Sequence, residues 1–257
     1  MVSRFAKFPT MEKIIDMHVH LWGHSVESDQ NALRGMLDRY PLAWLGVIPL
    51  WGGHYPSREE IRIGNDATLA FCKTDPARLK AYVTVNPCHA NSAEELQRCY
   101  DEGVTAAKIW VASRADDPVT FPVAEKCIEL NLPLLLHSFH KTVGQLPHET
   151  DAQHVAGLAK RYPELKIVMA HLAGNPLWGC AQIADCPNVW SDFSGSYCES
   201  DTIETAIYYL GENHVLFGSD APGADYLNNW GKMVDAKITP EQRHKIAYEN
   251  AHQLYGC

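Results

Sequence analysis

Eight short apolar runs recur along the chain, each followed by a polar loop and, in most cases, by a segment with helical spacing. Runs such as LPLLLH and IVMAH are almost continuously apolar, which is typical of strands buried on both faces of a parallel sheet. The runs lie at residues 14–20, 44–50, 79–86, 105–110, 132–137, 166–171, 188–193 and 214–220. Eight such βα units in 257 residues predict a (β/α)8 TIM-like barrel of the α/β class, with residues 1–257 forming a single domain.

The segments between the runs carry signals for helix starts. A Ser/Thr-x-x-Glu/Gln capping box begins at Ser57, Ser92, Thr150 and Thr239, and Pro122 fits the first turn of another helix. The alternative fold is an open doubly wound sheet, but no G-x-G-x-x-G follows the first run to support dinucleotide binding. The alternation of strands and helices therefore favours the barrel.

Composition restricts the classes of binding partner and the cellular compartment that we expect for this protein. The 22 Lys and Arg residues against 31 Asp and Glu residues leave a net charge of −9, which argues against nucleic-acid binding and favours a small-molecule substrate. The eight cysteines form no C-x-x-C pair, so we expect reduced thiols. The chain begins without an apolar signal-peptide segment, and its longest apolar run, residues 42–51, is too short for a membrane span. We expect a cytoplasmic protein with no membrane association.

The first run, IIDMHVHL, ends in two histidines. On an extended strand, side chains two residues apart share a face, so Asp16, His18 and His20 are expected to point the same way. Three later runs also end in a candidate ligand, at His137, His171 and Asp220. Because the carboxyl ends of all barrel strands meet at one mouth, these residues predict a metal centre there. Imidazole and carboxylate are ligands for zinc, manganese and iron(II).

The motifs IDMHVH, LLLH, VMAHLAG and LFGSDAPG, with the closing ENAHQLYG, resemble the amidohydrolase superfamily over about residues 14–255. Within it, the chain resembles the amidohydrolase-related family, which includes metal-dependent hydrolases and decarboxylases. The resemblance implies a TIM-like barrel and one metal held by His18, His20, His137 and Asp220. It also implies a catalytic role for His171 beside the metal.

The expected cofactor is one divalent metal ion, zinc in the first place, with Mn²⁺ or Fe²⁺ as alternatives. Bound zinc lowers the pKa of its water to about 7, so a hydroxide nucleophile is available at neutral pH. Asp220 is expected to take the proton of that water and pass it to the leaving group. His171 is expected to polarise the carbonyl of the substrate.

Lys108 is open to two interpretations. Some relatives carry a carboxylated lysine at the end of the fourth strand, where it bridges two metals. The alternative is a structural lysine paired with a carboxylate such as Asp16, because a buried ammonium group without a partner is costly. We predict a single metal and a structural Lys108.

Substrate contacts are predicted at three positions after the strands. His140 lies just past His137, Trp110 ends the fourth run, and Arg114 could bind a carboxylate bidentately. The alternatives are a solvated histidine, a core tryptophan, and an ion pair from Arg114 to Asp116 or Asp117. Asp192 and Ser194, at the end of the seventh run, are either contacts to the site or loop caps.

The leading functional hypothesis is a metal-dependent hydrolase that acts on a small ester, lactone or amide through a metal-activated water. The alternative is a lyase that decarboxylates an aromatic or unsaturated carboxylic acid with the same ligand set. A third hypothesis is a barrel that has lost catalysis and only binds a ligand, which a broken ligand set would indicate. A homodimer is a further expectation, because barrels of this group often pair.

Overall fold

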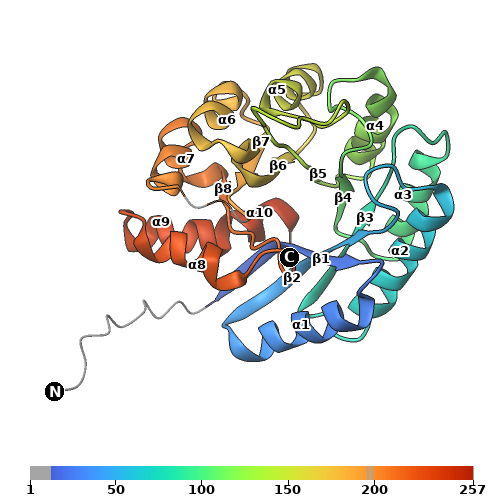
Figure 1. The fold of residues 1–257 in the computed structure, drawn as a ribbon, viewed down its shortest axis with the longest axis horizontal. Helices are drawn as coiled ribbons and strands as arrows, with labels where there is room; N and C mark the ends of the chain where they lie inside the picture. Colours follow the sequence, from blue (N-terminus) through green and yellow to red (C-terminus); the bar gives the residue numbers. More distant parts are fainter. Residues whose placement is uncertain (1–12, 196, 198, 257) are drawn as a thin grey trace.

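The computed structural model describes residues 13–195, 197 and 199–256. Eight parallel strands form one sheet in the order of the sequence, and helices surround it as a ring (Figure 1). The strands are β1 (Ile14–Trp22), β2 (Leu42–Leu50), β3 (Leu79–Thr84), β4 (Ala106–Ile109), β5 (Leu134–Leu136), β6 (Ile167–Met169), β7 (Val189–Asp192) and β8 (Val215–Leu216). This arrangement confirms the predicted (β/α)8 TIM barrel.

Backbone hydrogen bonds close the barrel between β1 and the chain that follows β8. Asp220 N donates to His18 O at 2.8 Å, and His20 N donates to Ala221 O at 2.7 Å. The first and last strands of the sheet are therefore neighbours. Closure places Asp220 directly beside the two histidines of β1.

The outer layer consists of helices that follow the strands in turn. These helices are α1 (Val26–Arg39), α2 (Arg58–Cys72), α3 (Ser92–Asp101), α4 (Phe121–Glu129), α5 (Ala152–Arg161), α6 (Pro176–Ile183), α7 (Thr202–Leu210), α8 (Tyr226–Asp235), α9 (Pro240–His244) and α10 (Asn250–Tyr255). Shorter helical turns are η1 (Pro118–Thr120), η2 (Ala170–Gly174), η3 (Glu212–His214) and η4 (Lys245–Glu249). No helix in the described ranges is long and apolar enough to cross a membrane.

Two of the four predicted capping boxes form. Ser57 caps α2 and Thr239 caps α9, each reciprocally with the third helical residue. The prediction at Thr150 is wrong by one residue, because the Asp151 carboxylate accepts from the first turn of α5. The prediction at Ser92 is also wrong, since its hydroxyl donates to the carbonyls of Asn86 and His89 and leaves α3 without a side-chain cap. Pro122 lies in the first turn of α4, as predicted.

Apolar side chains fill two layers. Val19, Leu21 and other outward-facing strand residues pack against the helices. Ile15, Met17 and Leu135 belong to the second, smaller cluster, which includes interior residues of the barrel. The packed interior supports the mouth, where the polar side chains gather.

Candidate metal centre

A β-bulge in β1 sets which side chains reach the mouth. Asp16 pairs with Leu45 and Val19 with Val47, so β1 has one residue more than β2 between these pairs. The bulge resets the alternation of side chains along the strand. The prediction that Asp16 shares a face with His18 and His20 is therefore wrong.

Asp16 instead joins β1 to the segment after β8. Its Oδ1 accepts hydrogen bonds from Ser219 N at 2.9 Å and from His18 N at 3.3 Å. Burial raises the pKa of Asp16 to about 7, although these hydrogen bonds act in the opposite direction. Asp16 therefore supports the backbone of the site.

His18, His20 and Asp220 converge at the closed seam of the barrel. His20 Nε2 lies 2.8 Å and His18 Nε2 lies 3.7 Å from Asp220 Oδ1. Burial lowers the pKa of His20 to about 4, so the ring is neutral near neutral pH. Burial opposes the charge of Asp220, but a hydrogen bond from His20 and the neighbouring histidines hold the pKa of Asp220 well below its usual range.

The donor atoms of this group fit a divalent metal. Each of the three residues offers one ligand atom, and these atoms lie within 4.8 Å of one another. His18 Nε2 is fully buried and has no hydrogen-bond partner among the described residues. A buried nitrogen without a partner is costly unless something binds its lone pair. Two imidazole nitrogens and a carboxylate oxygen suit zinc, manganese or iron(II).

Asp192, the last residue of β7, orients two histidines of the mouth. Its Oδ2 lies 2.9 Å from His18 Nδ1, and its Oδ1 accepts from the Ser194 hydroxyl. Ser194 Oγ in turn accepts from His171 Nδ1 at 2.8 Å, and the Ser194 carbonyl lies 3.2 Å from the same nitrogen. This network assigns the proton of both rings to Nδ1 and leaves both Nε2 atoms as acceptors. Burial opposes the charge of Asp192, but His18 keeps the pKa of Asp192 below its usual range.

His171 follows β6 in a left-handed turn. The φ angles of His171, Leu172 and Ala173 are 62°, 46° and 55°. Left-handed backbone at a residue with a side chain costs roughly 1–2 kcal/mol, and such strain is concentrated at functional sites. A Cβ at Gly179 would lie 2.4 Å from Leu172 O, so this glycine allows α6 to pack under the turn. Burial lowers the pKa of His171 to about 4.

His137 lies at the mouth and contacts Glu149, a residue that no sequence motif marks. Its ring centre is 5.3 Å from that of His171, and its Nε2 is 3.0 Å from Oε1 of Glu149. Among the described residues it belongs to neither close group of potential ligands. Glu149 has no motif of its own, since it lies in the loop before α5 and becomes a site residue only through folding.

Lys108, on β4, is 1% exposed in the barrel interior. The expected ion pair with Asp16 is absent, and no carboxylate in the described part of the chain lies within 4.0 Å of its ammonium group. The bulge in β1 explains the difference, because it directs Asp16 toward Ser219. Burial lowers the pKa of Lys108 to about 8, although Asp192 and Asp220 attract its charge.

The three predicted substrate contacts have different surroundings. The ring of His140 stacks on Trp178 with centres 4.1 Å apart. Arg114 is exposed, and within the described ranges it forms no ion pair with Asp116 or Asp117, so that alternative is wrong. Trp110 is half-buried and contacts other rings near the histidines.

An aromatic wall, formed by Trp22, His54 and Trp110, extends from His20. The ring centres are 5.2 Å apart for His20 and Trp22, 5.7 Å for Trp22 and Trp110, and 4.8 Å for His54 and Trp110. Trp22 is the last residue of β1, and His54 and Trp110 follow β2 and β4; both tryptophans are half-buried, whereas His54 is exposed. The mouth therefore offers aromatic surface next to the candidate metal ligands.

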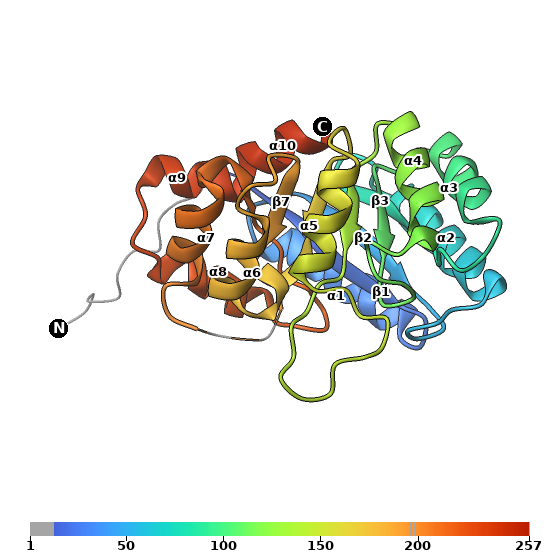
Figure 2. The same cartoon turned by 90° about the horizontal axis from the view of Figure 1, so that it is seen from above.

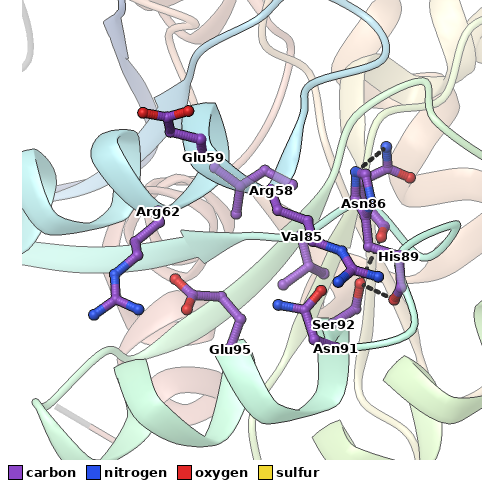
Figure 3. A pocket seen from close by; sticks show the side chains of 10 residues that line it. Arg58, Glu59, Arg62, Val85, Asn86, His89, Asn91, Ser92 and Glu95 are labelled. Carbon is purple, nitrogen blue, oxygen red and sulfur yellow. Dashed lines mark hydrogen bonds between the residues drawn. The ribbon is translucent and has the colours of Figure 1, made fainter.

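A separate pocket of about 280 Å³ lies between α2 and α3 (Figure 3). Arg58 and Arg62 come from α2, while Ser92 and Glu95 come from α3. None of the histidine or aspartate residues of the mouth lines it. The metal centre and this pocket are therefore different places on the molecule.

Comparison with known proteins identifies the family of the chain. A family model described as Amidohydrolase matches residues 15–257. The chain belongs to the amidohydrolase family. It is thus an enzyme of that family by sequence, and the resemblance carried by its motifs is confirmed. No curated protein matches the chain in sequence.

Solved structures share the fold at low sequence identity. A 2,6-dihydroxybenzoate decarboxylase in complex with 2,6-dihydroxybenzoate has a TM-score of 0.77 at 18% identity, covering 96% of this chain and 100% of that chain. A dihydroxybenzoic acid decarboxylase from Polaromonas sp. JS666, with bound manganese and 2-nitroresorcinol, has a TM-score of 0.76 at 19% identity, with coverages of 96% and 97%. A 4-oxalomesaconate hydratase from Rhodopseudomonas palustris has a TM-score of 0.70 at 19% identity, with coverages of 95% and 95%.

Proposed function

We propose that this amidohydrolase-family enzyme is a metal-dependent lyase that decarboxylates an aromatic carboxylic acid. The observation that carries the proposal is the aromatic wall beside His18, His20 and Asp220. A planar ring can stack on Trp110 or Trp22 while its oxygen substituents reach the ligand group. Two similar structures are named as dihydroxybenzoate decarboxylases, which supports the same substrate class.

The metal site of the proposal consists of His18, His20, His137 and Asp220, with one divalent ion. The donor set accepts zinc, our first expectation, as well as manganese or iron(II). Manganese is named in one of the similar decarboxylase structures, which supports a test of both ions. When bound, the ion supplies a Lewis acid that polarises an oxygen of the substrate or of water.

In decarboxylation, the bond between ring and carboxylate breaks, its electron pair stays on the ring carbon, and carbon dioxide leaves. That carbon then needs a proton. Asp220 is placed to accept a proton from a hydroxyl of the substrate and deliver it to the carbon. His171, with its Nδ1–H held by Ser194, presents Nε2 toward the mouth and orients a polar group of the substrate.

The second candidate is hydrolysis of a small ester, lactone or amide. The acceptor oxygens of Asp220 favour it, because the same carboxylate can take a proton from water and pass it to the leaving group. His171 would then hydrogen-bond the carbonyl under attack. We expect Trp110 to contact an apolar part of the substrate in either reaction, and His140 and Arg114 likewise stay predicted contacts.

The first experiment measures metal content by plasma mass spectrometry in the wild-type protein and in the double variant His18→Ala, His20→Ala. We expect about one ion per chain in the wild type and its loss in the variant. Protein loaded with Zn²⁺ or Mn²⁺ is then given a panel of hydroxybenzoates, esters and lactones. Release of carbon dioxide supports the lyase, and ester or lactone cleavage without it supports the hydrolase. A cytoplasmic location and a homodimer stay predictions.

A further inference from the structure

Glu149 is a buried carboxylate in the loop between β5 and α5. It is 2% exposed, although it lies in a loop that projects beyond the barrel (Figure 2). Its Oε1 lies 3.0 Å from His137 Nε2, and Lys141 Nζ donates to both of its oxygens at 2.6 and 2.8 Å. A buried carboxylate is stable only when its charge and its lone pairs have partners. Glu149 has both.

The loop holds Glu149 in place independently of His137. Phe139 N donates to Thr150 O at 2.9 Å and closes the loop at its base. Within the loop, Gln145 Nε2 donates to Phe139 O at 2.9 Å, and Leu146 N donates to Glu149 Oε2 at 3.2 Å. Because these contacts fix the carboxylate, His137 must orient to Glu149 and not the reverse.

A charged carboxylate can only accept hydrogen bonds, so His137 must carry its proton on Nε2. Its Nδ1 is then the nitrogen with a free lone pair. His18 and His171 have the opposite arrangement, because their Nδ1 atoms donate to Asp192 and Ser194. The mouth therefore contains histidines of two tautomers.

We propose that Glu149 is a positioning residue that fixes His137 as the Nε2–H tautomer, so that Nδ1 is the nitrogen His137 offers to the metal. The proposal rests on the metal site of the proposed function. A carboxylate that accepts from the far nitrogen of a ligand histidine fixes the ring and makes the ligand nitrogen more basic. Lys141 holds the carboxylate for this role and balances its charge.

The tautomer is tested first, on the wild-type protein without metal. Long-range nitrogen–proton correlation NMR of the imidazole rings distinguishes the two tautomers, and the variants His137→Asn and His18→Asn assign the signals. We expect the Nε2–H pattern for His137 and the Nδ1–H pattern for His18. A Nδ1–H pattern for His137 would overturn the proposal, whatever metal the protein binds.

The variants Glu149→Leu and Glu149→Gln test the consequence for the metal, with Co²⁺ alone as the probe. Glu149→Leu removes the acceptor, so we expect mixed tautomers at His137 and a Co²⁺ affinity lower by roughly 10–100-fold. Glu149→Gln keeps an amide oxygen that can accept from Nε2, so the tautomer and most of the affinity should be retained. Glu129→Gln, which breaks the exposed pair with Lys126 on α4, is the matched control and should change neither.

The outcomes separate this proposal from the proposed function. Equal Co²⁺ affinity and an unchanged visible spectrum in folded Glu149→Leu would overturn the role of Glu149, while the metal site itself would stand. A wild-type protein with the Nε2–H tautomer that binds no Zn²⁺, Mn²⁺ or Co²⁺ would overturn the proposed function. It would leave Glu149 as the residue that fixes the His137 ring.

Discussion

Asp192 Oδ2 accepts a hydrogen bond from Nδ1 of His18 at 2.9 Å, although 174 residues separate them in the chain. Its other oxygen, Oδ1, accepts a hydrogen bond from the Ser194 hydroxyl, and Ser194 Oγ accepts one from His171 Nδ1. One carboxylate at the end of β7 therefore sets the direction of two imidazoles from β1 and η2. Both rings present Nε2 to the mouth because both Nδ1 protons have an acceptor.

Replacing Asp192 by Asn should weaken metal binding. The amide has a single acceptor oxygen, so it cannot serve both His18 and Ser194. We expect the affinity for Mn²⁺ or Zn²⁺ to fall by roughly 10–100-fold, measured by competition with a chelator. Asp185→Asn, an exposed aspartate of the same chemistry, is the control. Equal affinities in the two variants would rule out the orienting role.

Replacing Asp220 by Asn should separate metal binding from turnover. The amide oxygen can still coordinate, but it does not carry a proton between substrate and product. We expect part of the metal to be retained and kcat to fall by about 10²–10⁴-fold, measured on the substrate found in the panel. Full activity in a metal-loaded variant would show that another group carries the proton.

The strand pattern was enough to predict the barrel and the meeting of His18, His20 and Asp220. In a closed parallel barrel, residues at the carboxyl ends of strands share one mouth whatever their distance in sequence. Several strands are shorter than the apolar runs that predicted them, but the prediction of the shared mouth still holds. Although β8 ends at Leu216, hydrogen bonds between Asp220 and His18 continue its path along β1.

The details that orient these ligands could not be predicted in the same way. The bulge that turns Asp16 away from the histidine face depends on how β1 pairs with β2. The IIDMHVHL pattern is equally compatible with a regular strand that has no bulge. The left-handed backbone at His171 depends on α6 packing closely under the turn at Gly179, where a Cβ would lie 2.4 Å from Leu172 O. Glu149 reaches His137 only because a loop folds back, and loops have no periodic signal.

Gly218 should tolerate no side chain, because it lies against His18. A Cβ at this position would lie 2.8 Å from His18 Cβ and 3.2 Å from Ser194 Cβ. We expect Gly218→Ala to lower the free energy of unfolding by about 1–3 kcal/mol and to weaken metal binding as His18 shifts. Urea unfolding and metal titration measure the two effects.

Gly231 provides the comparison for Gly218. It lies inside α8, and a Cβ there would meet nothing within 4 Å. Gly231→Ala should therefore raise the free energy of unfolding by up to about 1 kcal/mol, because alanine is the better helix former. If both substitutions changed stability alike, the steric explanation for Gly218 would be wrong.

Glu95 on α3 should make stability depend on pH in the acid range. Its carboxylate accepts hydrogen bonds from Asn65 on α2 at 2.9 Å and from Arg98 at 2.7 and 2.9 Å. Burial raises the pKa of Glu95, but the hydrogen bonds from Arg98 and Asn65 outweigh it, so the pKa in the folded protein lies below the ordinary value of 4.5. A carboxylate with a lower pKa in the folded than in the unfolded protein stabilises the folded state at pH values above the unfolded pKa. This stabilisation is lost as the pH falls through the folded pKa.

Glu95→Gln removes that charge at every pH. Near pH 7 we expect the free energy of unfolding of the variant to be about 1 kcal/mol lower than that of the wild type. The effect is this small because Arg98 is partly exposed and solvent screens its charge. The difference should begin to shrink as the pH falls below the ordinary value of 4.5 and should vanish once the pH is below the lowered pKa of the folded protein, because the wild-type carboxyl is then protonated too. Glu94→Gln is the control, since Glu94 shares the first turn of α3 but is exposed. Both substitutions remove a charge near the start of α3, so comparing them cancels the contribution of the helix dipole. If the difference in unfolding free energy between wild type and Glu95→Gln stayed constant with pH, the assignment to the Asn65–Glu95–Arg98 contacts would be contradicted.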